Sequence, residues 1–251
     1  MTPYDAMRFS AKDRSILRRL AEQVAQIASL PTHAHTIEGW KRVNGLQRGK
    51  PMVWINEIPW HEMDYNGELT LQTEDPFCRA QELQLRRTLY QWKHMRGDMV
   101  VEPVYYCPLV VHDTGFGIDE EVDIVRTDAA STIVSRHFHR QIDDEQDLEK
   151  IKMPRVTYDA EQTARNEDAL RGLFGDILPI VRRGQPGFWF APWDELIRWL
   201  NVEDAMLDLV DRPALVHQAM HRLVSAYLHR LDQYEALNLL SPNNNNVRVG
   251  S

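Results

Sequence analysis

A change of pattern at Asp159 limits the folds open to this chain more than any other feature. From that residue the chain reads as a helix, then a short strand within 176–184, and then a long helical region over 193–240. The helical region is interrupted near Asp211–Pro213, where Asp211 is expected to cap a new helix. Strands that alternate with helices are typical of βα units. We therefore expect an α/β protein with a parallel sheet or barrel.

The first hundred residues predict two helices with a strand between them. The first helix is expected to follow the N-cap Ser10 and to stop at Pro31, with apolar residues at helical spacing along it. The second is expected to be capped by Asp75 and terminated by Gly97. Between the two helices, the short apolar run Met52–Ile55 reads as a buried strand that ends in polar residues.

A β-rich segment follows at about 99–158. Its first part, 99–112, is β-branched and aromatic, but Pro103 and Pro108 restrict it to edge strands or a bulged hairpin. A further strand is expected within 131–142. We therefore divide the chain into an N-terminal helical segment, 1–50, and an α/β region, 51–251, in which 99–158 is an insertion.

Composition and charge exclude several classes of function. The chain has 251 residues, of which 43% are hydrophobic and 26% charged, as in an ordinary globular protein. Its net charge of −8 argues against a general nucleic-acid binder or an anionic-membrane binder, and no apolar run has membrane-spanning length. Cys78 and Cys107 are too few and too far apart for a disulfide framework or a zinc knuckle. We expect a reduced, cytoplasmic protein.

Three polar residues stand where a strand or helix is expected to end. Glu57 and His61 follow the run at 52–55, where a carboxylate and an imidazole can share a proton, bind a metal or orient a substrate. The alternative, a solvated loop, is slightly favoured by the residues alone. Asp176 follows a helix end and opens a strand, so a site carboxylate and a turn cap are equally supported.

An aromatic segment, Gly187–Trp199, can wall an apolar pocket or begin a helix that packs on the core. The pair Arg182 and Arg183 can hold an anion, although two adjacent arginines are weak evidence. Two His-x-His pairs, His33 with His35 and His137 with His139, are interpreted as surface residues rather than as metal ligands.

With these features the chain resembles the uroporphyrinogen decarboxylase superfamily, which includes the corrinoid-dependent methyltransferases. Leu173–Ile180, LFGDILPI, is similar to the family's Phe-Ser-Asp-Ile-Leu strand, whose aspartate lies in the pocket and matches Asp176. PMVWINEIPWH, which begins at Pro51, takes the place of the family's Pro-Val-Trp strand. The helical region around Asp211–Pro213 resembles the helix pair that follows the third strand.

The resemblance implies a TIM-type (β/α)8 barrel with its site at the C-terminal ends of the strands. The chain would then hold only the first part of that barrel, since it ends near the fourth strand. In the decarboxylases the Pro-Val-Trp strand runs into an Arg-x-x-x-Arg pair that holds tetrapyrrole carboxylates. Here Glu57 and His61 occupy those two places, which argues against a porphyrinogen substrate.

The function that the resemblance implies is transfer of a methyl group from a small methylated substrate to a corrinoid protein. Glu57, His61 and Asp176 would line the pocket, and Trp54, Asn56 and Trp193 would contact the substrate. Zinc would activate the substrate, and the residues that bind this zinc would lie outside this segment. We expect a corrinoid protein as a partner, and we expect binding to neither nucleic acid nor a membrane. The expectation also allows for a homo-oligomer. The alternatives are a non-catalytic binding or assembly protein and a divergent decarboxylase, which would need Arg182 and Arg183 to point into a pocket.

Overall fold

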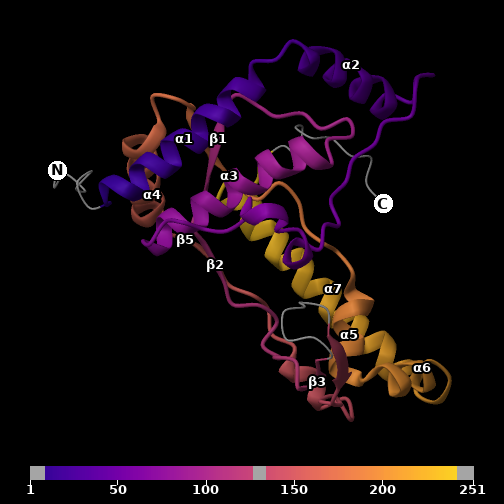
Figure 1. Cartoon of the computed structure of the whole chain (residues 1–251). Coiled ribbons are helices and arrows are strands. Elements are labelled where there is room, and N and C mark those ends of the chain that lie inside the picture. Colours follow the sequence, from indigo (N-terminus) through magenta and orange to yellow (C-terminus); the bar gives the residue numbers. More distant parts are fainter. Residues whose placement is uncertain (1–8, 127–133, 242–251) are drawn as a thin grey trace. The chain divides into compact units, whose positions relative to one another are not determined.

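The computed structural model describes residues 9–126 and 134–241, and the chain divides into two compact units. Unit 1 comprises Met1–Pro108, Glu161–Arg183 and Pro242–Ser251, and unit 2 comprises Leu109–Ala160 and Gly184–Ser241. Each unit is therefore assembled from segments far apart in the sequence, as the colours of Figure 1 show. The fourth strand of the barrel, near which the chain was expected to end, lies outside the described residues.

Unit 1 is mainly helical. Its elements are α1 (Ala11–Ala28), α2 (Thr32–Asn44), the short 3-10 turns η1 (Trp60–Glu62) and η2 (Tyr65–Gly67), α3 (Pro76–His94), β1 (Tyr105–Pro108), β6 (Ile180–Arg183) and nearly all of α4 (Ala160–Phe174). β1 and β6 pair in parallel, with Tyr105 opposite Ile180.

The predicted N-caps explain where α1 and α3 begin. The side chain of Ser10 accepts a hydrogen bond from Asp13 N at 3.0 Å, and that of Asp75 accepts one from Phe77 N at 2.9 Å. Each cap satisfies a backbone donor that the first turn of a helix leaves without a partner. α1 and α3 pack against each other. Their apolar faces meet α4 and β1 in a core that contains Leu17, Leu20, Leu85, Leu173 and Phe174.

Unit 2 combines two antiparallel strand pairs with three helices. Its elements are β2 (Val111–Asp113), β3 (Val122–Val125), β4 (Ser135–Phe138), the 3-10 turn η3 (Asp147–Lys150), β5 (Val156–Tyr158), α5 (Pro192–Leu200), α6 (Val202–Asp211) and α7 (Pro213–Ala236). β2 pairs with β5 and β3 with β4. The main core joins α5 and α7 and includes Leu196, Trp199, Leu200, Leu215 and Leu223.

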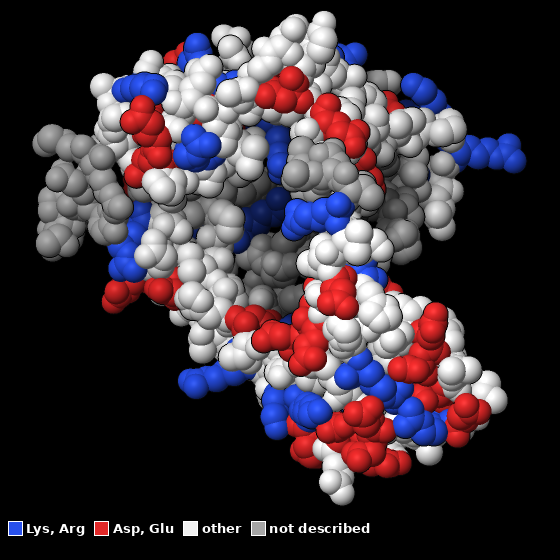
Figure 2. Space-filling model, turned by 60° about the horizontal axis from the view of Figure 1, so that its bottom comes forward, with Lys and Arg blue, Asp and Glu red and all other residues white. Residues whose placement is uncertain are grey.

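The two units differ in charge. Unit 1 contains 19 Lys and Arg and 17 Asp and Glu, whereas unit 2 contains 10 and 20. The formal charges are therefore +2 and −10, which together give the −8 of the whole chain. Figure 2 shows acidic side chains in clusters on the face it displays, with basic side chains beside several of them.

The mixed α/β class predicted from the sequence is confirmed, but the strand expected at Met52–Ile55 is wrong. Residues 51–59 form neither a helix nor a strand. The backbone N–H of Val53 donates to the carboxylate of Asp98 at 2.7 Å, and its carbonyl accepts from Asp98 N at 2.8 Å. Both groups that would pair with a neighbouring strand are thus engaged by a turn. The strands of residues 9–126 and 134–241 form three two-stranded sheets and no complete barrel.

Two details of the helical predictions also change. The N-cap of α7 is Arg212, without a side-chain capping hydrogen bond, so Asp211 does not cap that helix. A further interruption lies at Asn201, whose φ of 67° separates α5 from α6 and whose side chain caps α6. In addition, α1 packs on α3, so the segment 1–50 shares unit 1 with residues that follow it. Among the helices of the described ranges, none is both long and apolar enough to cross a bilayer.

Candidate functional site

Asp176 lies in the turn between α4 and β6 and is exposed. Its two carboxylate oxygens accept hydrogen bonds from the guanidinium of Arg18, at 2.7 and 2.6 Å. These hydrogen bonds lower the pKa of Asp176 below its usual value. The carboxylate therefore ties the turn to α1.

Glu57 and His61 are not joined to Asp176 by any hydrogen bond or ion pair within the described part of the chain. Glu57 is exposed and accepts a hydrogen bond from the side-chain amide of Asn56 at 3.3 Å. His61 lies in η1, where its Nε2 is 3.2 Å from a carboxylate oxygen of Glu62 but lacks hydrogen-bond geometry. The catalytic roles of Glu57, His61 and Asp176 stay predictions.

The aromatic residues predicted to contact the substrate contribute to packing. Trp54 is partly buried against the core of unit 1. Trp193 is partly buried against the core of unit 2, near the start of α5. Because much of each ring already packs against its own core, neither offers a free aromatic wall. Asn56 is exposed.

The paired arginines after the fourth helix are also engaged. Arg182 Nε donates to a carboxylate oxygen of Glu167 at 2.5 Å, and the Arg183 guanidinium lies 4.6 Å from the ring centroid of Tyr106. Each arginine thus has a neighbour within unit 1. This arrangement does not provide the inward arginine cluster that a decarboxylase would need.

The described residues contain no set of side chains placed to bind zinc. Within 9–126 and 134–241, no group of three or more His, Cys, Asp or Glu side chains is placed to hold a metal ion. Cys78 and Cys107 are buried free thiols, and burial raises the pKa of Cys78 to about 12. A thiol with such a pKa is protonated at neutral pH and is a poor metal ligand.

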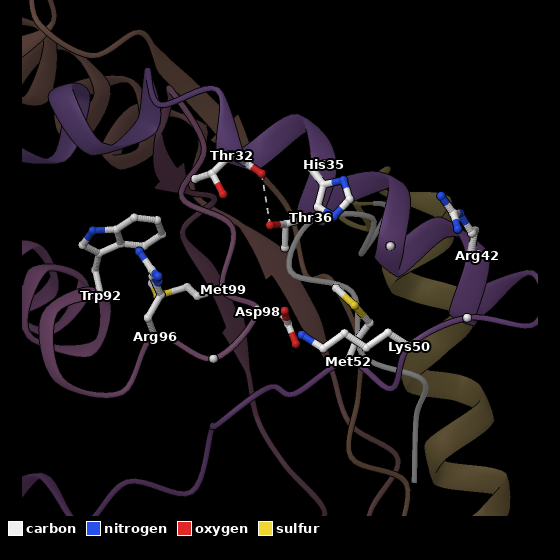
Figure 3. A pocket seen from close by; sticks show the side chains of 13 residues that line it. Thr32, His35, Thr36, Arg42, Lys50, Met52, Trp92, Arg96, Asp98 and Met99 are labelled. Carbon is white, nitrogen blue, oxygen red and sulfur yellow. Dashed lines mark hydrogen bonds between the residues drawn. The ribbon is translucent and has the colours of Figure 1, made fainter.

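A different site is present in unit 1: a pocket of about 430 Å³ bounded by α2, by the segment after it and by the end of α3 (Figure 3). The residues that line it include the cationic side chains of Arg42, Lys50 and Arg96, the polar residues Thr32, His35, Thr36 and Asp98, and the apolar side chains of Met52, Trp92 and Met99.

Helix α2 supplies the first wall because its two faces have different composition. Five residues of α2 line the pocket at successive spacings of three, one, three and three residues: Thr32, His35, Thr36, Gly39 and Arg42. A side chain at Gly39 would crowd this wall, since an added Cβ would lie 2.9 Å from Met52. The helix therefore presents a polar face to the pocket, and the missing side chain at Gly39 leaves room for Met52.

The opposite face of α2 anchors the helix. Trp40 is buried, and its indole N–H donates to the backbone carbonyl of Asp98 at 2.8 Å. His33 is also buried, with Nε2 2.8 Å from the carbonyl of Ile27 and its ring 5.0 Å from that of Trp92. The interpretation of His33 as a surface residue is therefore wrong, because the ring fills the space between α2 and α3.

Asp98 holds the second wall in place. Besides accepting from Trp40, it exchanges two hydrogen bonds with Val53, through its carboxylate and its backbone N–H. Gly97 makes this approach possible: its φ is +50°, and an added Cβ would lie 2.7 Å from the carbonyl oxygen of Val53. The turn at 96–99 thus fixes α2, the 50–53 segment and the end of α3 together.

The pocket has an excess of positive charge. Arg42, Lys50 and Arg96 form no ion pair with a carboxylate of the described residues, and the Arg96 guanidinium lies 5.0 Å from the ring centroid of Trp92. Among the described residues, Asp98 is the single acidic residue in the lining, and one of its oxygens is hydrogen-bonded to Val53 N. The electrostatic preference of this site is therefore for an anion.

Sequence reasoning missed this pocket, although two signals were available. The stretch Thr32–Asn44 carries polar residues at helical spacing directly after Pro31. Lys50 precedes the run that was interpreted as a strand. Neither signal shows that Arg96, at the end of another helix, faces the same space.

No protein-family model, curated protein or solved structure matches this chain.

Proposed function

We propose that unit 1 is a binding module for a small anionic compound that carries a phosphate or carboxylate group. The observation that supports this most is the placement of Arg42, Lys50 and Arg96 around one pocket without carboxylate partners. An anion in this pocket would meet three cationic side chains in the lining and could gain charge-assisted hydrogen bonds from them. The three segments that bear them meet through Asp98, which gives the pocket a defined shape.

The other lining residues indicate the rest of the ligand. The side chains of Met52, Trp92 and Met99 give part of the wall an apolar character, and Thr32 and His35 add polar groups. A volume of about 430 Å³ lies within the range of roughly 300–1,000 Å³ that small-molecule pockets occupy. We therefore propose a compound with one anionic group near the cations and an apolar or flat body against Trp92.

The test is titration of the whole chain with two simple anions, inorganic pyrophosphate and citrate, followed by nitrogen–proton NMR. At least one should shift the amide signals of α2 and of residues 96–99. The variant R42Q/K50Q should bind that anion about 10-fold to 100-fold more weakly, since a hydrogen bond to a charged group contributes about 1.5–3 kcal/mol.

The matched control is R48Q, because Arg48 is exposed and lies in the same connecting segment but does not line the pocket. Its affinity should stay within about twofold of the unmodified chain, as expected for a charge that acts only through screened solvent. If R48Q weakens binding as much as R42Q/K50Q, the binding is non-specific and the proposal fails. It fails equally if neither anion shifts the pocket signals.

Methyl transfer to a corrinoid protein is a second proposal, and it rests on the sequence resemblance together with one feature of the fold. β1 and β6 pair in parallel and α4 directly precedes β6, an arrangement that a (β/α)8 barrel repeats. The test is metal analysis of the purified protein, followed by binding to a corrinoid protein. Absence of both zinc and corrinoid-protein binding would remove this proposal and leave anion binding untouched.

A further inference from the structure

Helix α6 in unit 2 turns its large apolar side chains to solvent, whereas one small residue and one carboxylate face inward. Ala205 and Asp208 are its buried residues. The exposed residues are Val202 at 45%, Met206 at 52%, Leu207 at 60%, Leu209 at 48% and Val210 at 80%. A helix on the surface of a globular protein normally has the opposite arrangement. An exposed apolar face of this kind is typical of an interaction surface.

A buried ion network holds α6 in this orientation. The Asp208 carboxylate, in a residue only 3% exposed, accepts a hydrogen bond from Arg140 Nη2 at 2.8 Å and another from Arg212 Nε at 2.8 Å. Rotating α6 to bury its apolar residues would carry this carboxylate outward and leave Arg140 without it. The ion pairs of Asp208 therefore keep the apolar face exposed to solvent.

The exposed residues are close enough to act together. Val202, Met206, Leu209 and Val210 are spaced by four, three and one residues, so they share one side of the helix. Leu207 extends the same side beyond Glu203. We call the surface formed by Val202, Met206, Leu207, Leu209 and Val210 the α6 face.

The charge around the α6 face identifies the kind of occupant. Glu203 and Asp211 are exposed on the same helix, and unit 2 as a whole contains 20 Asp and Glu against 10 Lys and Arg. A second copy of this chain would bring the acidic residues of two such helices together, and like charges juxtaposed across an interface oppose binding. A basic partner would instead meet complementary charge.

We propose that the α6 face docks an amphipathic helix of a partner protein whose apolar stripe is flanked by Lys and Arg. The apolar stripe would cover Met206 and Val210, and its basic flanks would lie near Glu203 and Asp211. This mode of recognition places the apolar side of one helix on an exposed apolar surface, with charged rims fixing its orientation.

The test uses the whole chain and a fluorescent synthetic helix of leucine and lysine, with the leucines in one stripe, monitored by fluorescence anisotropy. A second peptide has the same composition but the leucines distributed around the helix. The striped peptide should bind more tightly than the distributed one, and its affinity should fall as salt is added. The double variant M206E/V210E should weaken binding by at least about tenfold, as loss of central apolar contacts does at other interfaces.

The matched control is V125E/L237E, which adds the same two charges at exposed apolar positions of unit 2 that are not part of α6. It should bind the striped peptide like the unmodified chain, and circular dichroism should show both variants folded. Equal binding of the two peptides, or equal weakening by the two variants, would overturn the proposal. So would a dimer in sedimentation that M206E/V210E abolishes, because the occupant would then be a second copy.

Discussion

Unit 1 and unit 2 each bury one carboxylate that is paired with arginine, but the two carboxylates do different work. In unit 1, Glu82 accepts hydrogen bonds from the backbone of Gln72 and Thr73, from the Thr73 hydroxyl and from Arg86. In unit 2, Asp208 is held by two arginines. Glu82 ties a loop to the packed side of α3, whereas Asp208 fixes a helix with its apolar face outward. A buried carboxylate can therefore either stabilise the packing of a core or keep an apolar surface exposed to solvent.

The strongest test of this contrast is E82A. Glu82 is fully buried, so its removal leaves Thr73, Gln72 and the buried Nε of Arg86 without their acceptor. We expect unit 1 to lose about 3–5 kcal/mol, as when one partner of a buried pair is removed. Native-state hydrogen exchange should show the loss in α1 and α3 but not in α7.

The control for E82A is E74A. Glu74 is exposed, and its side chain pairs only with the exposed Lys12. Such a surface pair contributes about 0–1 kcal/mol. If E74A reduced the protection of α3 as much as E82A, the special role of the buried carboxylate would be wrong.

A smaller effect is expected for D208A in unit 2. Arg212 is 44% exposed and can return to water, while Arg140, at 14%, loses a buried acceptor. We expect a loss of about 1.5–3 kcal/mol, typical of a hydrogen bond to a charged group. Exchange should increase in α6 and at the start of α7. An effect larger than that of E82A would reverse the comparison between the units.

The stability of unit 1 should depend on pH through the carboxylate of Glu82. Burial alone would raise the pKa of Glu82, but hydrogen bonds from Thr73, Gln72 and Arg86 hold that pKa below its ordinary value of 4.5. The stabilisation is therefore complete above pH 4.5 and is lost as the pH falls through the lower pKa of the folded state. Urea unfolding of unit 1 should show this acid-side slope, and E82Q should flatten it. An unchanged slope in E82Q would assign the dependence to other carboxylates.

The smallest effect is expected from the helix caps. S10A removes the side chain that accepts from Asp13 N, which should cost about 1 kcal/mol in α1. S15A is the matched control, because Ser15 is exposed inside the same helix and alanine favours a helix. Urea unfolding should separate the two variants. Equal stability would mean that α1 depends on packing against α3 rather than on its cap.

Local features of the fold could be predicted from the sequence, and features that depend on distant residues could not. Ser10 and Asp75 cap helices through residues two or three positions away, so a short stretch contains the whole signal. The run at 52–55 resembles a strand, but Asp98, 45 residues later, takes the hydrogen bonds of Val53. No short stretch of sequence contains that competition.

The candidate site residues likewise depend on partners that are distant in the sequence. Asp176 was expected to open a strand, but it lies in the turn before β6, and its partner Arg18 is 158 residues away in the sequence. The cations of the pocket come from α2, from the segment after it and from the end of α3. Likewise, Arg140 fixes the orientation of α6 from 68 residues away. Composition showed that the chain was acidic overall, but not that the excess lies in unit 2.

Asp98 has a consequence for how the pocket can be observed. Its carbonyl receives the indole N–H of buried Trp40, while Arg96 and Met99, on either side of it, line the pocket. A compound that shifts this turn therefore changes the surroundings of an indole that it does not touch. Because tryptophan emission depends on hydrogen bonding and polarity near the ring, a bound compound should change the emission of Trp40 through this turn and that of Trp92 directly, since Trp92 lines the pocket.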